Sequence, residues 1–265
     1  MDLVELRGIA ARAAARGSKV VRERAAHILP GRAVAEKGAG DYVTEVDVAS
    51  ERAIAELLRD ETPDVPVLGE EGGGAALGAG RAWVVDPLDG TTNFVHGFPL
   101  VGVSVALVEN GRPVAGAVEA PLLGERWIAS RGAGAFAVRT GDEATVRLSV
   151  SRRDPARAVV ATGFPFRHKE VLPRYLSAME EALRRFEGLR RPGAAALDLA
   201  WVAAGVFDGF FELRLSAWDV AAGALLIEEA GGVVTDWEGG DDYLGGDILA
   251  GSAAIHAELR EVTRR

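Results

Sequence analysis

The feature that most constrains the fold is an apolar run at residues 83–85 that ends in the octapeptide DPLDGTTN at residues 86–93. Such a run is typical of a buried strand. Pro87 withholds a backbone N–H and stiffens the turn that follows, and Gly90 lets the backbone come close to a ligand. Thr91 and Thr92 resemble the first turn of a helix. We therefore expect a strand, a sharp turn and a helix start in immediate succession.

This segment also brings together groups with a defined chemistry. Asp86 and Asp89 supply the hard carboxylate oxygens that Mg²⁺ or Mn²⁺ prefers. The free N–H groups of a helix's first turn bind anions such as phosphate. The segment thus offers metal ligands beside a phosphate cradle. In the alternative interpretation the aspartates only cap a turn that opens a helix.

Composition excludes several other classes of protein. The formal net charge of −9 repels nucleic acid and anionic lipid, so we expect neither a nucleic acid nor a membrane as partner. The chain has no cysteine, which excludes disulfides and thiolate sites, and its four histidines disfavour a multi-histidine metal site. Charges interrupt the first residues, and no run reaches the ~18 apolar residues of a membrane span. We expect a cytoplasmic protein.

Hydrophobic periodicity predicts a mixture of helices and strands without strict alternation. We expect helices at residues 2–29, 45–59, 169–186, 194–204, 218–230 and 256–263. We expect strands at residues 65–68, 83–85, 101–108, 114–118, 127–129, 159–162, 207–213 and 232–235. This order favours an α/β or α+β protein of layered sheets and helices. The arginines at 152 and 153 are the best candidate for a boundary between two halves.

Four motifs in the same order resemble the inositol monophosphatase family, which are lithium-sensitive, magnesium-dependent phosphomonoesterases. Residues 83–93 reproduce the family's first motif, and WDVAAG at residues 218–223, followed by EEAGG at 228–232, reproduces the second. GEE at residues 69–71 matches the upstream metal-binding motif. Lys37 and DYVTEVD at residues 41–47 match a further stretch. The resemblance extends from about residue 3 to residue 255.

The resemblance implies an α-β-α-β-α sandwich folded as one compact unit. Residues 1–150 would form an N-terminal half with most of the metal ligands. Residues 151–265 would form a C-terminal half with the substrate-ring contacts and Asp219. Members commonly form homodimers, so we expect one here.

The resemblance also implies a set of metal ligands. Glu70, Asp86 and the carbonyl of Leu88 would hold a first Mg²⁺. Asp86, Asp89 and Asp219 would hold a second, and Glu70 would reach a third ion through water. Mn²⁺ is a reasonable substitute. Two or three divalent ions make an acidic site locally positive, which reverses the inference from net charge.

The remaining roles are carried over in the same way. Glu70, Asp47 and Thr91 would be catalytic, with Thr91 and Asp47 orienting and deprotonating the attacking water. The implied substrate contacts are Asp89, Gly90, Thr91, Ala195, Glu212 and Asp219. Among these, Gly90 and Thr91 would donate N–H groups to the phosphate, and Glu212 would bind ring hydroxyls. Lys37 is either a surface lysine or part of the phosphate or metal site.

The predicted activity is Mg²⁺-dependent hydrolysis of inositol monophosphate or a related sugar or cyclitol phosphate. Alternative substrates are fructose 1,6-bisphosphate and histidinol phosphate. Ala194 stands where many relatives carry Ser or Thr, which removes a hydroxyl near the ring. A different class of function is an interaction with the transcription machinery, as in some bacterial relatives. The intact carboxylate set favours the enzyme.

Overall fold

The apolar run at residues 83–85 lies within β4 (Arg81–Asp89) of the computed structural model, buried on both sides. Trp83 and Val85 point into one hydrophobic cluster and Val84 into another, as the two-residue period of a strand requires. A strand covered on both faces has a continuous apolar sequence. The structure describes residues 1–25, 35–38, 41–74, 77–78, 80–139 and 144–264.

β4 belongs to a seven-stranded sheet with the order β3-β4-β5-β6-β7-β8-β9. Its other strands are β3 (Val67–Gly69), β5 (Gly102–Glu109), β6 (Arg112–Ala120), β7 (Glu125–Ser130), β8 (Gly134–Arg139) and β9 (Thr145–Arg147). β3 runs parallel to β4, and every later neighbour is antiparallel. β1 (Ala35–Gly38) and β2 (Asp41–Val43) form a separate antiparallel pair.

A second sheet has five strands in the order β11-β10-β12-β14-β13. They are β10 (Val159–Thr162), β11 (Gly188–Arg190), β12 (Gly209–Glu212), β13 (Val233–Thr235) and β14 (Ile248–Gly251). β10 pairs in parallel with β11 and β12, whereas β14 is antiparallel to both of its neighbours. The sheet is therefore mixed.

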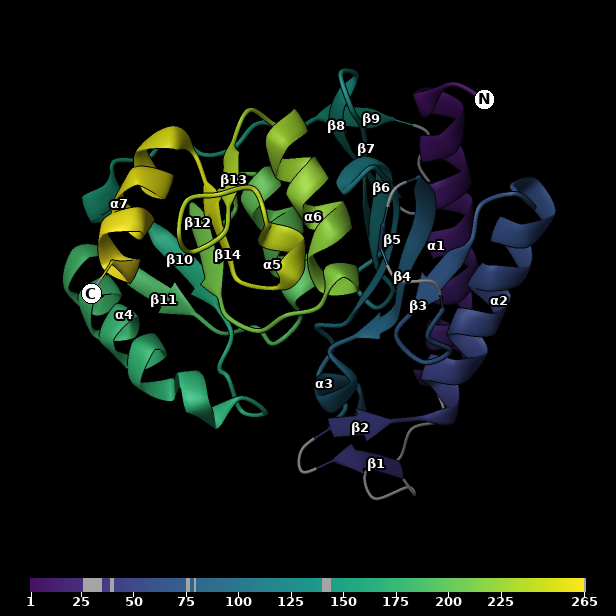
Figure 1. Cartoon of the computed structure of the whole chain (residues 1–265), viewed down its shortest axis with the longest axis horizontal. Coiled ribbons are helices and arrows are strands. Elements are labelled where there is room, and N and C mark those ends of the chain that lie inside the picture. The colour runs from purple at the N-terminus through teal and green to yellow at the C-terminus, as the bar shows by residue number, and fades with distance from the viewer. Residues whose placement is uncertain (26–34, 39–40, 75–76, 79, 140–143, 265) are drawn as a thin grey trace.

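Helices form the other three layers (Figure 1). α1 (Leu3–Ala25) and α2 (Glu45–Glu61) cover the outer face of the larger sheet. α5 (Ala195–Ala203) and α6 (Ala217–Glu229) lie between the two sheets, and α4 (Leu172–Arg185) and α7 (Ala253–Thr263) cover the outer face of the smaller one. The short α3 (Thr91–Val95) follows β4. The expected α-β-α-β-α sandwich is confirmed.

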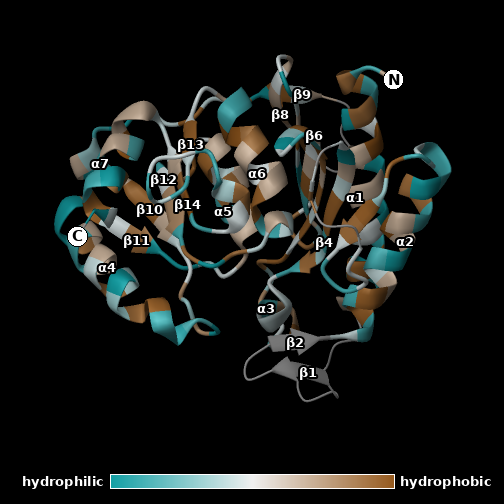
Figure 2. Ribbon diagram, in the orientation of Figure 1, coloured by the Kyte–Doolittle hydropathy of each residue, from teal (hydrophilic) through white to brown (hydrophobic). Residues whose placement is uncertain are grey.

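Three hydrophobic clusters fill the gaps between the five layers. One lies under α1 and α2, one surrounds α5 and α6 and reaches both sheets, and one lies under α4 and α7. Figure 2 shows apolar residues along the strands and the inner faces of the helices, and hydrophilic residues on the outer faces of α2, α4 and α7. The middle helices touch closely, because a Cβ at Gly223 of α6 would lie 2.4 Å from Cβ of Leu199 in α5. Within the described residues, none of the helices combines the length and apolarity that crossing a membrane requires.

The expected elements are present with shifted ends. The helix expected at residues 2–29 ends at Ala25 as described, and residues 26–29 lie outside the described part of the chain. The helix expected at 169–186 is a 3₁₀ turn at Lys169–Val171 followed by α4, because Pro173 favours a helix's first turn. Strands β1, β2, β8, β9, β11 and β14 were not predicted. Since α5 and α6 contact both sheets, the division at residue 150 stays a prediction.

Candidate metal centre and active site

Three carboxylates meet where the end of β4 lies beside the first turn of α6. Asp86, Asp89 and Asp219 each offer an oxygen, and these oxygens lie within 4.8 Å of one another. Asp86 and Asp89 are three residues apart, so a regular strand would turn them to opposite faces. β4 instead has an irregular register between them, with Asp86 opposite Ser104 and Asp89 opposite Gly102. Such a bulge re-aims side chains, and here it brings both aspartates into one cluster.

Asp219 reaches the cluster from the first turn of α6. The backbone N–H of Ser216 donates to Oδ2 of Asp219 at 2.6 Å, which holds the carboxylate at the start of the helix. The carbonyl of the preceding Trp218 accepts the hydroxyl of Ser104 at 3.1 Å. Ser104 is also the partner of Asp86 across the larger sheet. The start of α6 is thus fixed beside the strand that carries the other two carboxylates.

Asp89 also caps a distant helix. Its Oδ2 accepts the N–H of Ala196, in the first turn of α5, at 2.7 Å. Ala194, the residue before this helix, makes no capping bond through its side chain. A carboxylate at a helix N-terminus satisfies an unpaired N–H group and meets the positive end of the helix dipole. Because Ala194 cannot cap α5 through its side chain, Asp89 provides the capping hydrogen bond.

Glu70 lies in the turn after β3, with its backbone N–H bonded to the carbonyl of Val85 at 3.2 Å. The turn is held by Glu51 of α2, whose carboxylate accepts the N–H groups of Glu71 at 2.8 Å and Gly72 at 2.7 Å. Glu51 was not predicted as part of the site. Glu51 follows Asp47 by four residues, so both side chains lie on one face of α2. This spacing is the sequence signal that could have identified Glu51 as part of the site.

Burial and mutual repulsion raise the pKa values of the three carboxyls in the cluster. Burial, together with the charges of Glu70, Asp89 and Asp219, raises the pKa of Asp86 well above its usual range. Burial and the Asp219 charge raise the pKa of Asp89 to about 7, although backbone N–H groups at Ala196, Ala195 and Leu197 oppose the shift. Burial raises the pKa of Asp219 to about 6. Closely packed carboxyls that are costly to ionise together are the setting in which a cation binds well.

Thr91 and Asp47 form a hydrogen-bonded pair beside the cluster. The Thr91 hydroxyl lies 2.9 Å from Oδ1 of Asp47 and 3.1 Å from the carbonyl of Leu88. Asp47 is fully buried in the first turn of α2, where Oδ2 accepts the Thr44 N–H at 2.8 Å. Burial raises the pKa of Asp47, and hydrogen bonds from Thr44 and Thr91 lower it. With its proton directed to an acceptor, the Thr91 oxygen is available to accept from a water.

A cavity of about 490 Å³ contains this chemistry. Its lining includes all the residues predicted to hold metal or substrate: Glu70, Asp86, Leu88, Asp89, Gly90, Thr91, Ala195, Glu212 and Asp219. This volume lies within the range of small-ligand sites. Gly90 has a φ of 87°, and a Cβ there would lie 3.1 Å from the carbonyl oxygen of Leu100. The left-handed turn that places α3 against this cavity therefore favours glycine.

The far wall of the cavity carries two more carboxyls. Burial and the Asp219 charge raise the pKa of Glu212 to about 8, and Arg191 opposes the shift. Burial raises the pKa of Asp198 well above its usual range. Oδ1 of Asp198 is buried without a hydrogen-bond partner. Asp198 was not predicted, although a lone acid in the apolar sequence of α5 was a usable signal.

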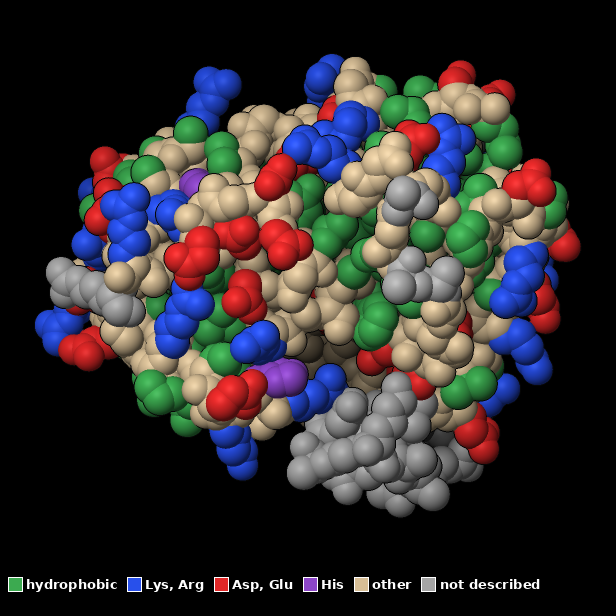
Figure 3. Space-filling view, in the orientation of Figure 1, with side chains coloured by type: hydrophobic (Ala, Val, Ile, Leu, Met, Phe, Trp, Pro, Cys, Tyr) green, Lys and Arg blue, Asp and Glu red, His purple; other side chains and the backbone are tan. Residues whose placement is uncertain are grey.

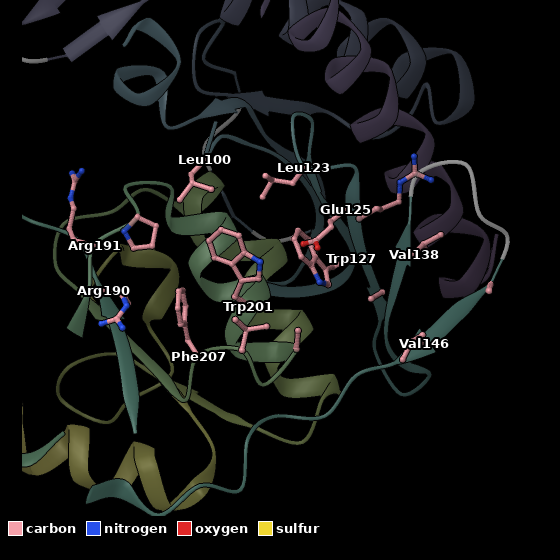
Figure 4. Close-up of a pocket in the computed structure, with 16 residues that line it drawn as sticks. Leu100, Leu123, Glu125, Trp127, Val138, Val146, Arg190, Arg191, Trp201 and Phe207 are labelled. Carbon is pink, nitrogen blue, oxygen red and sulfur yellow. The ribbon is translucent and has the colours of Figure 1, made fainter. Parts of the chain in front are cut away.

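A larger cavity of about 880 Å³ lies elsewhere, between β7, β8 and the end of α5. Figure 4 shows Trp127, Trp201 and Phe207 turned toward it, with Val138 and Val146 along one side and Arg190 and Arg191 at the other. Among the residues that the structure describes, its lining is mainly apolar and includes a single acid, Glu125. We assign the chemistry to the smaller cavity because the carboxylate cluster lies there.

The structure also shows how the end of the first motif is anchored. The Asn93 amide, at the end of the first motif, donates to the carbonyls of Leu100 at 2.7 Å and Pro192 at 2.9 Å. This bond ties α3 to the segment that leads into α5. The motif contained Asn93, but no role was predicted for it. The side chain of Lys37 lies outside the described part of the chain.

The residues present fit divalent metal ions. The donors are hard oxygens from Asp86, Asp89 and Asp219, and they converge within a few ångströms. Glu70 acts on Asp86 through its charge, and both it and Leu88 line the same cavity. Oxygen-rich sets of this kind suit Mg²⁺ or Mn²⁺.

The chain is similar to known proteins over nearly its whole length. Residues 2–265 match the model of the inositol monophosphatase family. The chain is 47% identical to Nus factor SuhB of Pseudomonas aeruginosa over 233 residues, which cover 85% of this chain and 84% of the relative. It is 45% identical to inositol-1-monophosphatase of Rhizobium meliloti over 235 residues, covering 88% and 86%. The crystal structure of extragenic suppressor protein suhB from Bartonella henselae has a TM-score of 0.90 and 38% identity, covering 98% of this chain and 99% of that one.

Proposed function

This chain belongs to the inositol monophosphatase family, and we propose on that basis that it is a magnesium-dependent phosphomonoesterase acting on inositol monophosphate or a related sugar or cyclitol phosphate. The observation that carries the proposal is the convergence of Asp86, Asp89 and Asp219 in a ligand-sized cavity. A catalyst of phosphate-monoester hydrolysis must lower a very high barrier, and positioning alone does not suffice.

The carboxylates would hold the metal ions. Glu70, Asp86 and the Leu88 carbonyl would bind one ion, and Asp86, Asp89 and Asp219 another, with a third reached from Glu70 through water. When bound, such ions neutralise charge on the phosphate, lower the pKa of water and stabilise the leaving oxygen. The hydrogen bonds to Asp89 from Ala196 and to Asp219 from Ser216 hold these ligands in place beforehand.

Thr91 and Asp47 would orient the attacking water. Because the Thr91 hydroxyl donates to Asp47, its oxygen faces the water as an acceptor. A proton taken from the water can pass through Thr91 to the buried Asp47 carboxylate, with Glu70 acting from the other side. The N–H groups of Gly90 and Thr91 would bind the phosphate oxygens.

The opposite wall would bind the part of the substrate that leaves. Glu212 would accept hydrogen bonds from ring hydroxyls, and the backbone at Ala195 would donate to the same ring. Both residues line the cavity that holds the metal ligands. Ala194 contributes no hydroxyl, which favours a tolerant site over strict selection of inositol. We expect the enzyme to act in the cytoplasm.

We also propose a homodimer. The larger apolar cavity supports it, since exposed Leu123, Val146 and Val206 adjoin Trp201 and Phe207 there. Burying such a patch in a subunit interface is favourable. Analytical ultracentrifugation of the wild type and of Val206→Asp tests this proposal, with a shift to monomer expected for the variant.

The relative named Nus factor raises a second function, binding to the transcription machinery. That function does not require the carboxylate set, whereas the phosphatase does. Activity is tested by phosphate release over a panel of phosphate esters with Mg²⁺, with and without excess EDTA. We expect turnover with Mg²⁺, none in EDTA, and recovery on adding Mg²⁺ back. Undiminished turnover after verified metal removal would refute the mechanism.

A further inference from the structure

Asp198 is a buried acid in the wall of the smaller cavity. It lies in the first turn of α5 with 1% of its surface exposed, and it lines the cavity that holds the acid cluster. Figure 3 shows the hollow where this cavity opens, at the lower centre of the molecule beside basic side chains and a histidine. Arg167, Arg191 and Arg214 of the lining are exposed. Asp198 therefore belongs to the inner wall and not to the basic mouth.

The geometry of α5 directs Asp198 toward the cavity. Ala194, Ala195 and Asp198 line the cavity, whereas Ala196 and Leu197 lie outside its lining. Residues three or four apart share one face of a helix, so Asp198 lies one turn along from Ala194 and Ala195. The backbone at Ala195 is the group that would donate to the substrate ring. Asp198 thus lies on the wall where the ring would bind.

One carboxyl oxygen of Asp198 has no partner in the protein. Oδ1 is buried and makes no hydrogen bond with any of the described residues. The other buried side-chain atoms of this kind in the described part of the chain are the hydroxyls of Ser18 and Ser130, which are neutral and lie outside the cavity lining. An unbonded polar atom in a protein interior lowers stability, so a group kept in this state requires an explanation.

The start of α5 does not supply that explanation. An acid in the first turn of a helix can accept the free N–H groups there. At this helix Asp89 accepts the Ala196 N–H at 2.7 Å, whereas Oδ1 of Asp198 accepts none. Burial, together with the charges of Glu212 and Asp89, raises the pKa of Asp198 well above its usual range, and Arg191 opposes the shift. These surroundings favour a protonated carboxyl, which is a hydrogen-bond donor.

We propose that Asp198 is a specificity-determining residue, whose carboxyl group donates a hydrogen bond to a hydroxyl of the substrate ring beside the hydroxyls that Glu212 binds. This inference rests on the proposed phosphatase function and adds a residue to its substrate wall. A hydroxyl oxygen accepts one hydrogen bond while its proton is donated to another group, so two carboxyls on one wall can bind neighbouring hydroxyls in opposite senses. A site built to bond a hydroxyl discriminates strongly against an analogue that lacks it.

The test compares two substrates with the same six-membered ring. Inositol 1-phosphate carries ring hydroxyls, and cyclohexyl phosphate carries none. We would measure kcat/KM for both with Mg²⁺ in the wild type, Asp198→Ala and Asp198→Asn. Alanine removes the carboxyl group and suits a helix. Asparagine is the matched control, because it has nearly the same shape and still donates through its amide.

The wild type should prefer inositol 1-phosphate. Asp198→Ala should lower the ratio of inositol to cyclohexyl kcat/KM by roughly 10-fold, as loss of a hydrogen bond to the substrate does. Asp198→Asn should keep the ratio within about threefold of the wild type. The ratio isolates the ring contact, because both substrates present the same phosphate to the metal centre.

Deoxyinositol 1-phosphates, each lacking one hydroxyl, would locate the contact. One of them should cause in the wild type the same loss that Asp198→Ala causes with the full substrate. The variant should then show no further loss on that deoxy substrate, since the contact is already absent. A different deoxy substrate should show this behaviour with Glu212→Ala.

Thermal unfolding distinguishes this role from a structural one. Removal of a buried acid without a partner should leave the Tm of the metal-free protein unchanged or raise it, because residues kept for function are often unfavourable for stability. The Mg²⁺-induced rise in Tm should equal that of the wild type in both variants, because Asp198 is not among the proposed metal ligands.

Four results would overturn the inference: equal losses on both substrates in folded Asp198→Ala, an unchanged ratio in that variant, an Asp198→Asn variant as impaired as the alanine variant, or no deoxy substrate on which the effect disappears. A lowered Tm with equal losses would make Asp198 structural, and a smaller Mg²⁺-induced rise in Tm would assign it to the metal centre. Hydrolysis of both esters by the wild type without a preference for inositol 1-phosphate would refute the inference and leave the phosphatase function standing. No hydrolysis of any ester with Mg²⁺ would remove both proposals.

Discussion

The Thr91 hydroxyl lies 2.9 Å from Oδ1 of Asp47, a carboxylate buried in the first turn of α2. The two residues are 44 positions apart in the chain, and they meet because α3 begins directly after the β4 bulge. Each side chain makes a further hydrogen bond: the Thr91 hydroxyl donates to the Leu88 carbonyl, and the Asp47 carboxylate accepts the Thr44 N–H. The geometry of this pair is therefore set by two separate elements.

The Thr91–Asp47 pair predicts the outcome of a conservative exchange. Thr91→Val keeps the shape of the side chain but removes the hydroxyl that positions the water. We expect kcat to fall by about 100-fold or more, as the loss of a general acid–base contact does. Thr91→Ser is the matched control and should keep most of the activity. Steady-state phosphate release at saturating Mg²⁺ measures both, and equal rates for the two variants would remove Thr91 from the mechanism.

Asp219→Asn should lower kcat by at least ~100-fold, because it removes the proposed metal ligand, whose contact would act in the transition state. Asparagine can still accept the Ser216 N–H, so the fold should persist. The Mg²⁺-induced rise in Tm should also shrink, which ties the loss to the metal. A variant with near wild-type kcat at saturating Mg²⁺ would place Asp219 outside the metal centre.

Protons should compete with metal ions at the cluster. Asp89 and Asp219 have pKa values of about 7 and about 6, raised from 3.8. These carboxyls titrate near pH 3.8 in the unfolded chain and near pH 6 to 7 in the folded, metal-free protein. Between pH 3.8 and about pH 7 the folded protein therefore binds more protons than the unfolded chain. These groups contribute stability that is lost as pH rises through about 6 to 7.

Metal binding needs the ionised forms, so its pH dependence has the opposite sign. The affinity for Mg²⁺ should fall by on the order of 100-fold between pH 8 and pH 5.5. Calorimetric titration at both pH values measures it. An affinity independent of pH would show that these carboxyls do not bind the ion.

Millimolar Li⁺ should inhibit turnover. The expectation comes from the family resemblance, which gives a small, weakly held ion site at Asp86, Asp89 and Asp219. Inhibition should be measured at limiting Mg²⁺, with K⁺ at the same concentration as control. Full activity in high Li⁺ would mean that this site differs from that of the family.

Glu212 should act on the ring and not on the phosphate above about pH 8, where its raised pKa leaves it ionised, because an ionised carboxylate accepts from hydroxyls and repels a phosphate dianion. Glu212→Ala should lower kcat/KM for a sugar or cyclitol phosphate by ~10–100-fold. The loss on an aryl phosphate, which has no ring hydroxyl, should be far smaller. Equal losses on both would make Glu212 a structural residue or a metal ligand.

Much of the fold was predictable where elements are long or strongly patterned. The periodic apolar residues of α1 and α2 and the apolar run of β4 mark their elements without help from tertiary contacts. Strands of three or four residues, such as β11 and β14, carry too little pattern to be recognised. Their extended form depends on pairing with neighbours such as β10 and β12.

The site also has a part that could be predicted from local sequence and a part that could not. The motifs predicted which acids form the cluster, because those residues lie in fixed local contexts. The contact between Asp89 and Ala196 spans 107 positions and was not predictable from local pattern. Neither was the bulge that aligns Asp86 with Asp89, since it depends on register with β5. Asp198 and Glu51 were missed because a single acid in a helix is ordinarily solvated.

Asp219 stands at the start of a helix that lies between the two sheets and is buried from Val220 to Ile227. A segment of this kind exchanges its amide hydrogens only when the whole molecule unfolds, whereas loops exchange by local opening. Backbone motions that would carry α6 away from β4 should therefore be rare. A metal ion or a substrate should therefore enter a site whose carboxylates are already together. Its association rate is then set by diffusion and by the charge at the mouth of the cavity, without a preceding rearrangement of the carboxylates.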